Sequence, residues 1–151
     1  MAIAQQSKYL ESKVLAAPPH RLHLMLLEGA IRNGRQAAEA LRRGDSQAAA
    51  APLLRVVDIV GELLAGVREQ RTEVNKNITE LYWFLFRRVS EAKIQCDEAI
   101  LGEALRLLEY ERQTWVLVCE KLGAEPAAPA AAATTDRHDA SSSAPRLSLE
   151  A

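Results

Sequence analysis

The stretch TEVNKNITELYWFLFRRVSEAKI, residues Thr72–Ile94, decides the fold. Apolar residues recur along it at steps of three and four, which is the spacing of one face of an α-helix. They are Val74, Ile78, Leu81, Leu85, Val89 and Ala92. The pattern continues for about six helical turns without Gly or Pro, which is too long for an ordinary strand. The sequence therefore predicts a long helix here.

This predicted helix is apolar nearly all round in its middle. Tyr82 and Phe86 widen its apolar face, whereas Trp83 and Phe84 point away from that face. A helix of this kind is either central in a bundle or partly uncovered and able to bind a partner. The sequence leaves both interpretations open.

The composition indicates one helical domain without a strongly charged surface for nucleic acid or an anionic membrane. The chain has 151 residues, rich in Ala, Leu, Glu, Arg and Gln, and a formal net charge of −1. A balanced charge gives no electrostatic footprint for nucleic acid or an anionic membrane. The N-terminus has no charged-then-apolar leader, and no window approaches a membrane span. We expect a cytoplasmic protein.

Motifs for catalysis or metal binding are missing from the sequence. Bundle metal sites use Glu-x-x-His pairs, and this chain contains none. His20 and His23 share a helix face without an evident third ligand, so we expect exposed polar residues rather than a zinc site. Cys96 and Cys119 lie on different predicted helices and are expected to be small apolar residues in a reducing compartment. The sequence predicts no enzyme and no cofactor.

Three further segments carry helical periodicity. Their expected bounds are about Pro19–Arg43, Asp45–Glu69 and Asp97–Gly123. Gly44 suits the position just past a helix, and Asp45 and Asp97 are candidate caps, as is Thr72 for the aromatic helix.

Pro52 is the difficulty in the second of these helices, because proline removes a hydrogen bond and clashes with the preceding turn. Either that helix is kinked at Pro52, or it begins later and Ala48–Ala51 is a loose lead-in. The four alanines favour the kinked helix.

The two ends of the chain differ from its middle. Met1–Ala17 is a short arm in which one or two amphipathic turns are expected, because it is too short to be stable alone. Residues 124–151 are rich in Ala, Pro, Ser and Thr and cannot bury enough apolar surface to fold, so we expect a disordered tail. The predicted fold is an all-α antiparallel four-helix bundle over residues 1–123, with a helical arm in front and the tail behind.

The segment VLAAPPHRLHLMLLEGAI, Val14–Ile31, resembles the opening of the flagellar export chaperone family, FliS. That family shows a Tyr, a Val, a small-residue and Pro turn, a Leu-rich run and an acidic-Gly-Ala step. The matching residues here are Tyr9, Val14, Ala17, Pro19, Leu22, Leu26, Glu28, Gly29 and Ala30. Leu27, where the family often has Tyr, and Pro18, where it has Ser, depart from the pattern.

Two further motifs extend the resemblance over about Tyr9–Leu122. The family's Asn-Leu-x-x-Leu-Tyr run with a following aromatic, Arg-Arg and Glu-Ala is matched by Asn77, Ile78, Leu81, Tyr82, Phe84, Arg87, Arg88, Glu91 and Ala92. The last helix matches through Asp97, Leu105, Leu107, Leu108 and Trp115. Each motif alone is weak, but the three in the right order are fairly specific.

The resemblance implies a cytoplasmic chaperone that binds the C-terminal segment of flagellin, prevents premature polymerisation and assists delivery to the export gate. Such a segment would fold as it binds in a long apolar groove. With the excess apolar surface of the aromatic helix, this places the expected partner contacts at Ile78, Leu81, Tyr82 and Leu85. A neighbouring helix, the second or the fourth, would complete the groove.

The arm adds Tyr9, Leu10 and Val14 to the expected partner-binding residues. Because it needs an apolar surface, we favour a lid that covers the groove until flagellin displaces it, with a direct contact to flagellin as the alternative. A second class of function is also open. A non-enzymatic helical module could form a homodimer, or act as an adaptor, through the same aromatic face.

Overall fold

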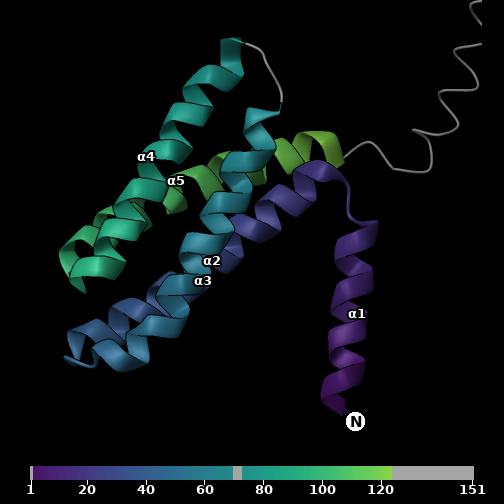
Figure 1. Cartoon of the computed structure of the whole chain (residues 1–151). Helices are drawn as coiled ribbons and strands as arrows, with labels where there is room; N and C mark the ends of the chain where they lie inside the picture. The colour runs from purple at the N-terminus through teal and green to yellow at the C-terminus, as the bar shows by residue number, and fades with distance from the viewer. Residues whose placement is uncertain (1, 70–72, 124–151) are drawn as a thin grey trace, which may run out of the picture. The chain divides into compact units, whose positions relative to one another are not determined.

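The computed structural model describes residues 2–69 and 73–123, and within them the side chains of residues 5–12, 16–69 and 75–123 (Figure 1). The described chain is entirely helical outside its turns. Its helices are α1 Ala2–Ala16, α2 Pro19–Arg42, α3 Ser46–Arg68, α4 Glu73–Gln95 and α5 Glu98–Gly123. None of the described helices is long and apolar enough to cross a membrane.

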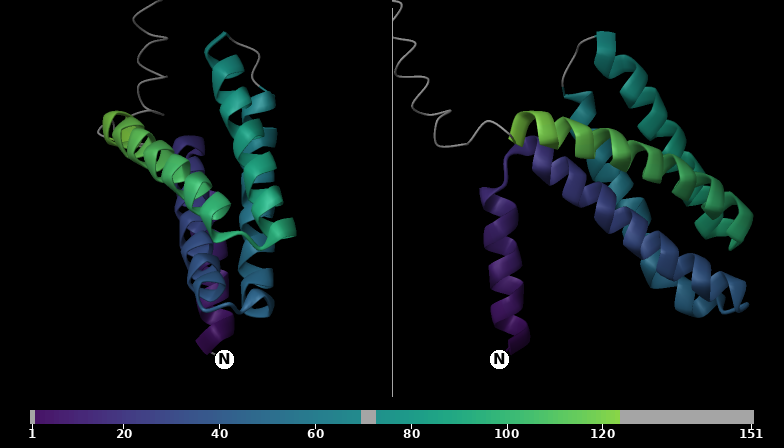
Figure 2. Two further views of the ribbon diagram at one scale, coloured as in Figure 1. Left: turned by 90° about the vertical axis from the view of Figure 1, so that its left-hand side faces the viewer. Right: turned by 180° about the vertical axis from the view of Figure 1, so that it is seen from behind.

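Helices α2 to α5 form the predicted antiparallel four-helix bundle, in which α2 lies against α3 and α3 against α4 (Figures 1 and 2). One core cluster contains large side chains from all four helices, including Leu27, Val60, Tyr82 and Leu108. A second cluster is built mostly from alanines, with Leu53 and Leu101. Their burial removes the apolar faces of four amphipathic helices from water, which is the main favourable contribution to folding.

The helix boundaries follow the expected capping signals. Pro19 opens α2, and Gly44 follows its end with φ of 76°, in the left-handed region that glycine adopts without strain. The Asp45 carboxylate accepts a hydrogen bond from the Ala48 amide at 3.0 Å. The Asp97 carboxylate accepts two, from Ala99 at 2.8 Å and Ile100 at 3.2 Å. The expected cap Thr72 lies outside the described residues.

Pro52 lies inside a continuous helix. Helix α3 begins at Ser46, so Pro52 is well past the first turn, and the interpretation of a later helix start was wrong. Ala49 is fully buried one turn earlier, as is Leu53 one residue later. Their packing and the Asp45 cap therefore hold this part of α3 helical despite the hydrogen bond that proline cannot donate.

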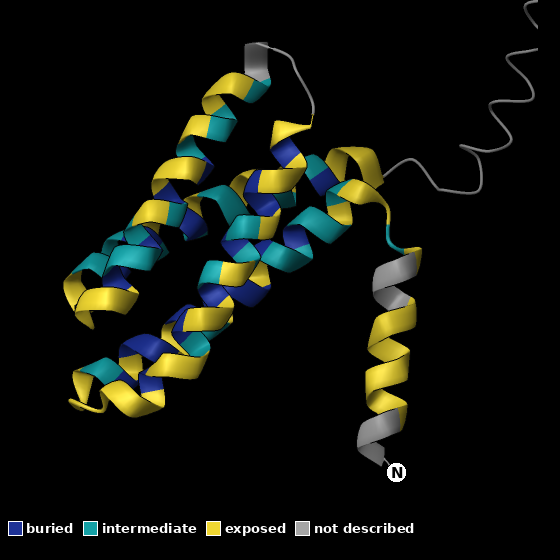
Figure 3. Ribbon diagram, in the orientation of Figure 1, coloured by how far each residue is buried: buried dark blue, intermediate teal, exposed yellow. Residues whose placement is uncertain are grey.

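The N-terminal arm is a longer helix than its sequence suggests. We expected one or two turns, but α1 spans 15 residues. Its described side chains, residues 5–12, are all exposed (Figure 3). Local helix propensity rather than packing therefore accounts for these turns, because they bury no apolar face.

Small residues bring α2 close to α5. A Cβ placed on Gly34 would lie 2.5 Å from Leu105 Cδ2, whereas one on Gly29 would make an ordinary contact of 3.6 Å with Ile59 Cδ1. The sequence pointed to Gly29 and Ala30 as the residues that permit a close approach. Both are buried, but of the two glycines Gly34 has the tighter contact.

The chain divides into two compact units, Met1–Val116 and Leu117–Ala151. The bundle core and all the residues discussed as a site below belong to the first unit. In the second, only the end of α5 is described, and residues 124–151, the expected tail, lie outside the described part. The predicted boundary after Gly123 stays a prediction.

Candidate partner-binding site

The inner face of α4 is bundle core. Tyr82, Leu85 and Val89 recur at three and four residues, and all three are fully buried. They pack in one cluster with side chains of the other three bundle helices. For this face of the aromatic helix, the core interpretation is confirmed.

A polar cluster interrupts this apolar face at Tyr82. The Tyr82 hydroxyl donates to Glu111 Oε2 at 2.7 Å and lies 2.7 Å from His23 Nε2. Because a hydroxyl has one proton, the His23 ring must donate to Tyr82, which places its proton on Nε2. The His23 ring also stacks on Trp115, with centroids 3.9 Å apart. The cluster therefore ties α2, α4 and α5 together.

Burial perturbs the two ionisable rings of this cluster. It lowers the pKa of His23 to about 4, so the imidazole is neutral at pH 7. Burial also raises the pKa of Tyr82, and the negative charge of Glu111 raises it further. The expectation that His23 is an exposed polar residue was wrong. Its sequence neighbours give no signal for its partners Tyr82 and Trp115, which lie 59 and 92 residues away.

The outer face of α4 leaves large apolar side chains in solvent. Trp83 is 48% exposed and Ile94 is 81% exposed, and Phe84 is also exposed. Trp83 and Phe84 thus point away from the core, as their positions in the sequence predict. The helix is both central in the bundle and partly uncovered, so the two interpretations left open each describe one side of it.

A shallow apolar groove lies on this outer face. It has a volume of about 280 Å³ and is lined by Trp83, Phe86, Arg87, Ser90, Glu91, Ile94 and Gln95. We call it the aromatic groove. Trp83 and Phe86 stack in parallel, with centroids 5.8 Å apart and planes inclined by 5°. Phe86 reaches across to α3, where a Cβ on Gly61 would lie 3.5 Å from its ring. The Phe86 ring therefore packs on α3 at ordinary contact distance beside Gly61.

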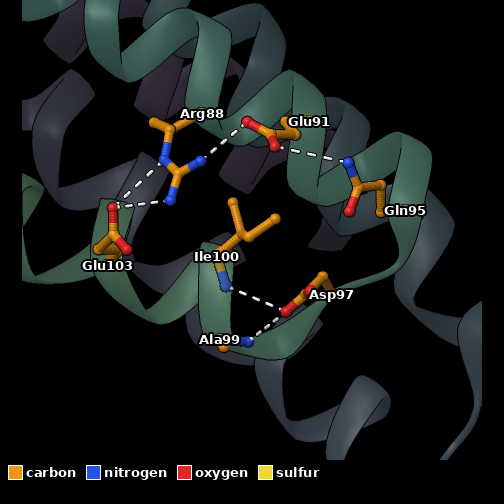
Figure 4. A network of polar contacts seen from close by, with 7 residues as sticks. All are labelled: Arg88, Glu91, Gln95, Asp97, Ala99, Ile100 and Glu103. Carbon is orange, nitrogen blue, oxygen red and sulfur yellow. Dashed lines mark hydrogen bonds and ion pairs between the residues drawn. The ribbon is translucent and has the colours of Figure 1, made fainter.

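Ion pairs fix the helix that carries the groove. Arg88 binds Glu103 of α5 at 2.8 Å and Glu91 of its own helix at 2.9 Å (Figure 4). Glu91 also accepts a hydrogen bond from Gln95 at 3.4 Å. A separate set of hydrogen bonds in Figure 4, from the Ala99 and Ile100 amides to Asp97, caps α5 at the corner. The second half of α4 is therefore held to α5 by Arg88 and by the short corner.

The structure separates the predicted partner-binding residues into three groups. Ile78 and Leu81 are half-buried and pack against the core cluster. Tyr82 and Leu85 are fully buried beneath them, so a partner could reach these two only if the bundle rearranged. Tyr9 and Leu10 of α1 are 67% and 55% exposed. Val14 is also in α1, but its side chain lies outside the described ones. No observation tests whether these residues contact a partner.

The lid expected from the sequence stays a prediction. Tyr9 and Leu10 are exposed, and so are Trp83 and Ile94 of the aromatic groove.

A signal for the aromatic groove was present in the sequence. Trp83, Phe86, Ser90 and Ile94 follow one another at steps of three and four, which makes a second stripe beside the core stripe.

A larger hollow, of about 640 Å³, lies between α2 and α5 and is different in character. Charged residues of both signs line most of it, and several are already paired. Glu109 binds Arg35 at 2.8 Å and Arg112 at 2.6 Å. The charges largely cancel, and the one large apolar side chain in its lining, Ile31, is buried. Despite its smaller size, the aromatic groove is the better candidate for binding an apolar partner.

The described residues hold no group of three or more His, Cys, Asp or Glu side chains that could bind a metal ion. Cys96 is exposed at the corner between α4 and α5, and Cys119 is buried in α5. A helical bundle with an uncovered apolar groove on one helix is an arrangement found in one class of helix-binding proteins.

Comparison with known proteins identifies the family within this class. The sequence model of the family described as "Flagellar protein FliS" matches residues 1–122. A "Flagellar secretion chaperone FliS" of Salmonella typhimurium is 33% identical over 122 residues, covering 80% of this chain and 89% of the relative. "Flagellar secretion chaperone FliSB" of Pseudomonas aeruginosa is 28% identical over 111 residues, covering 73% and 88%. The chain belongs to the FliS family of flagellar secretion chaperones.

Proposed function

We propose that this protein is a cytoplasmic, non-enzymatic chaperone that binds the C-terminal segment of flagellin, keeps it from polymerising and assists its delivery to the export apparatus. Family membership over residues 1–122 carries this proposal. The export gate is the second partner expected for a chaperone that hands over its client. The relatives' names place them in flagellar secretion, and flagellin is the client that the resemblance of the sequence implies.

The uncovered apolar surface of α4 supports a client of this chemistry. An amphipathic segment needs an apolar surface on which to fold, and Trp83 and Ile94 offer one at the solvent boundary. We place the client on the aromatic groove and on the half-buried Ile78 and Leu81 nearer the start of α4. Tyr82 and Leu85 support this surface from beneath.

Helix α1 provides a second set of contacts in this proposal. Tyr9, Leu10 and Val14 would pack on the bound flagellin segment, and the exposure of Tyr9 and Leu10 leaves them accessible for it. Deleting Met1–Lys13 should then weaken flagellin binding while leaving the bundle folded. Tighter binding after the deletion would instead support the lid.

Titration of the full chain with a peptide of the flagellin C-terminal segment tests the client and its site. Trp83→Ser and Leu81→Glu should each reduce affinity by about tenfold or more, since central aromatic and aliphatic contacts dominate such interfaces. Tyr110→Ser is the matched control, because Tyr110 is an exposed aromatic residue outside the groove.

Circular dichroism of each variant separates binding from folding. Leu81→Glu is the critical case, because Leu81 packs against the core cluster and a buried charge there would destabilise the bundle. If the wild-type chain does not bind the peptide, the proposed client is wrong. Folded Leu81→Glu and Trp83→Ser variants with unchanged affinity would show that the client binds elsewhere.

A further inference from the structure

The two charged residues of the aromatic groove are unequally satisfied. Among the described residues that line it, Arg87 and Glu91 carry a charge. Glu91 is bound by Arg88 at 2.9 Å and by Gln95 at 3.4 Å (Figure 4). Arg87 is exposed and makes no ion pair within the described part of the chain. The groove therefore presents one unpaired positive charge beside its apolar wall.

The two consecutive arginines of α4 have different surroundings. Arg88 is half-buried and already binds Glu91 of its own helix and Glu103 of α5. Its guanidinium is used to hold the bundle together. Arg87 points to the outer side, where no carboxylate of the described residues binds it. Of this pair, Arg87 alone is therefore available to a carboxylate of a partner.

A client that covers the groove must satisfy the guanidinium of Arg87. A charged group that loses water without gaining a partner costs free energy, and a carboxylate matches the planar guanidinium with two acceptor oxygens. We propose that Arg87 is a specificity-determining residue of the aromatic groove, which selects an amphipathic helix carrying an aspartate or glutamate beside its apolar face. This inference rests on the proposed function and adds a required residue type to the client.

The lining of the groove also indicates how far this acid lies from the client's apolar side chain. Ser90 has the smallest side chain of the lining and lies four residues from both Phe86 and Ile94. The stacked rings of Trp83 and Phe86 form a flat wall beside it. A large apolar side chain can therefore enter over Ser90. Arg87 lies three residues from Ser90, so their Cβ atoms are about 5 to 6 Å apart. On a bound helix, this distance separates an apolar residue and an acid three or four positions apart.

Titration of the full chain with a peptide of the flagellin C-terminal segment, at about 0.15 M salt, measures the contribution of Arg87. Arg87→Gln should weaken binding about threefold, and Arg87→Glu, which reverses the charge, about tenfold. The matched control is Arg106→Glu, because Arg106 is an exposed arginine of α5 outside the groove and its reversal changes the net charge equally. The control should stay within about twofold of the wild type. Ser90→Phe fills the hollow and should weaken binding about tenfold.

Peptides in which one Asp or Glu at a time is replaced by Lys identify the partner of Arg87. One of them should bind the wild type more weakly than the unmodified peptide does, and bind Arg87→Glu more tightly. The same peptide should show no such gain with Arg106→Glu. A peptide with an amidated C-terminus should keep its dependence on Arg87. Loss of that dependence would assign the contact to the terminal carboxylate and overturn the proposal of a side chain.

The outcomes separate this inference from the proposed function. If the wild-type chain does not bind the peptide, the proposed client is wrong and this inference falls with it. If the wild type binds but Arg87→Glu and Arg106→Glu bind alike, the specificity assigned to Arg87 is wrong, whereas flagellin remains the client. Failure of every Lys-substituted peptide to restore binding to Arg87→Glu would overturn it in the same way. Thermal melts establish that the variants are folded.

Discussion

The two sides of α4 share one helix and opposite physical roles. On the inner side Tyr82, Leu85 and Val89 are fully buried, and the hydroxyl of Tyr82 is bound by His23 and Glu111. On the outer side Trp83 and Ile94 remain in solvent along the aromatic groove. An aromatic residue at position 82 is thus part of the fold, whereas its neighbour at 83 is available to a partner. Substitutions on the two sides should therefore separate stability from binding.

The largest effect is expected from a charge on the inner side. Leu85→Asp places a carboxylate in the apolar core without a partner, which costs more than about 4 kcal/mol of unfolding free energy. We expect the variant to be unfolded or molten at 25 °C by near-UV circular dichroism. Ile94→Asp, the same chemistry on the outer side of the helix, should retain the wild-type spectrum. A folded Leu85→Asp variant with a wild-type melting temperature would contradict the division between the two sides.

Acid should destabilise the inner side through His23. Burial lowers its pKa from 6.5 to about 4, so between these values the unfolded chain binds a proton that the folded chain does not. Stability is therefore complete above pH 6.5 and is lost progressively as the pH falls towards 4. We expect a loss of about 2 kcal/mol from this group, allowing for the solvent contact of a half-buried ring.

Urea unfolding at several pH values measures this loss. The control is His23→Gln, whose amide can still donate to Tyr82 but does not titrate. The stability difference between wild type and this variant should decrease as the pH falls from 7 to 4.5. If the difference is independent of pH, His23 does not titrate in this way.

A smaller effect is expected from removing one hydroxyl. Tyr82→Phe keeps the ring in the core but leaves His23 Nε2 and Glu111 Oε2 without their shared partner. Leaving buried polar groups unpaired costs about 1 to 2 kcal/mol, reduced here because Glu111 is half-exposed. Thermal or urea unfolding measures this loss. Tyr110→Phe, which removes the hydroxyl of an exposed tyrosine on α5, should change stability by less than about 0.5 kcal/mol.

Most of the fold could be predicted because its determinants are local. Periodic apolar residues, the Asp45 and Asp97 caps and the glycine after α2 are each read from a few consecutive positions. The predicted α1 was too short, because a helix without a tertiary contact was expected to be unstable. In the structure α1 is helical over 15 residues. The continuous helix through Pro52 depends on packing at Ala49 and Leu53, which the sequence around the proline does not reveal.

The candidate site was harder to predict because it depends on how helices meet. The sequence identified α4 as the partner-binding helix but could not say which of its apolar residues the other helices would cover. Tyr82 is covered because Glu111 and His23, far away in sequence, bind its hydroxyl. Phe86 forms one wall of the groove and packs beside Gly61 of α3, a residue far away in the sequence. Such coincidences between distant residues leave no periodic pattern in one sequence.

The smallest effect on stability is expected on the outer side, where it is most informative. Trp83→Ser removes a half-exposed ring and its stack on Phe86, and should change the unfolding free energy by less than about 1 kcal/mol. The same variant should lose affinity for the flagellin peptide, because the client is placed on the aromatic groove. Urea unfolding and peptide titration of one preparation measure both quantities. A variant with a large loss of stability would mean that Trp83 belongs to the core, and the two sides of α4 would no longer have separate roles.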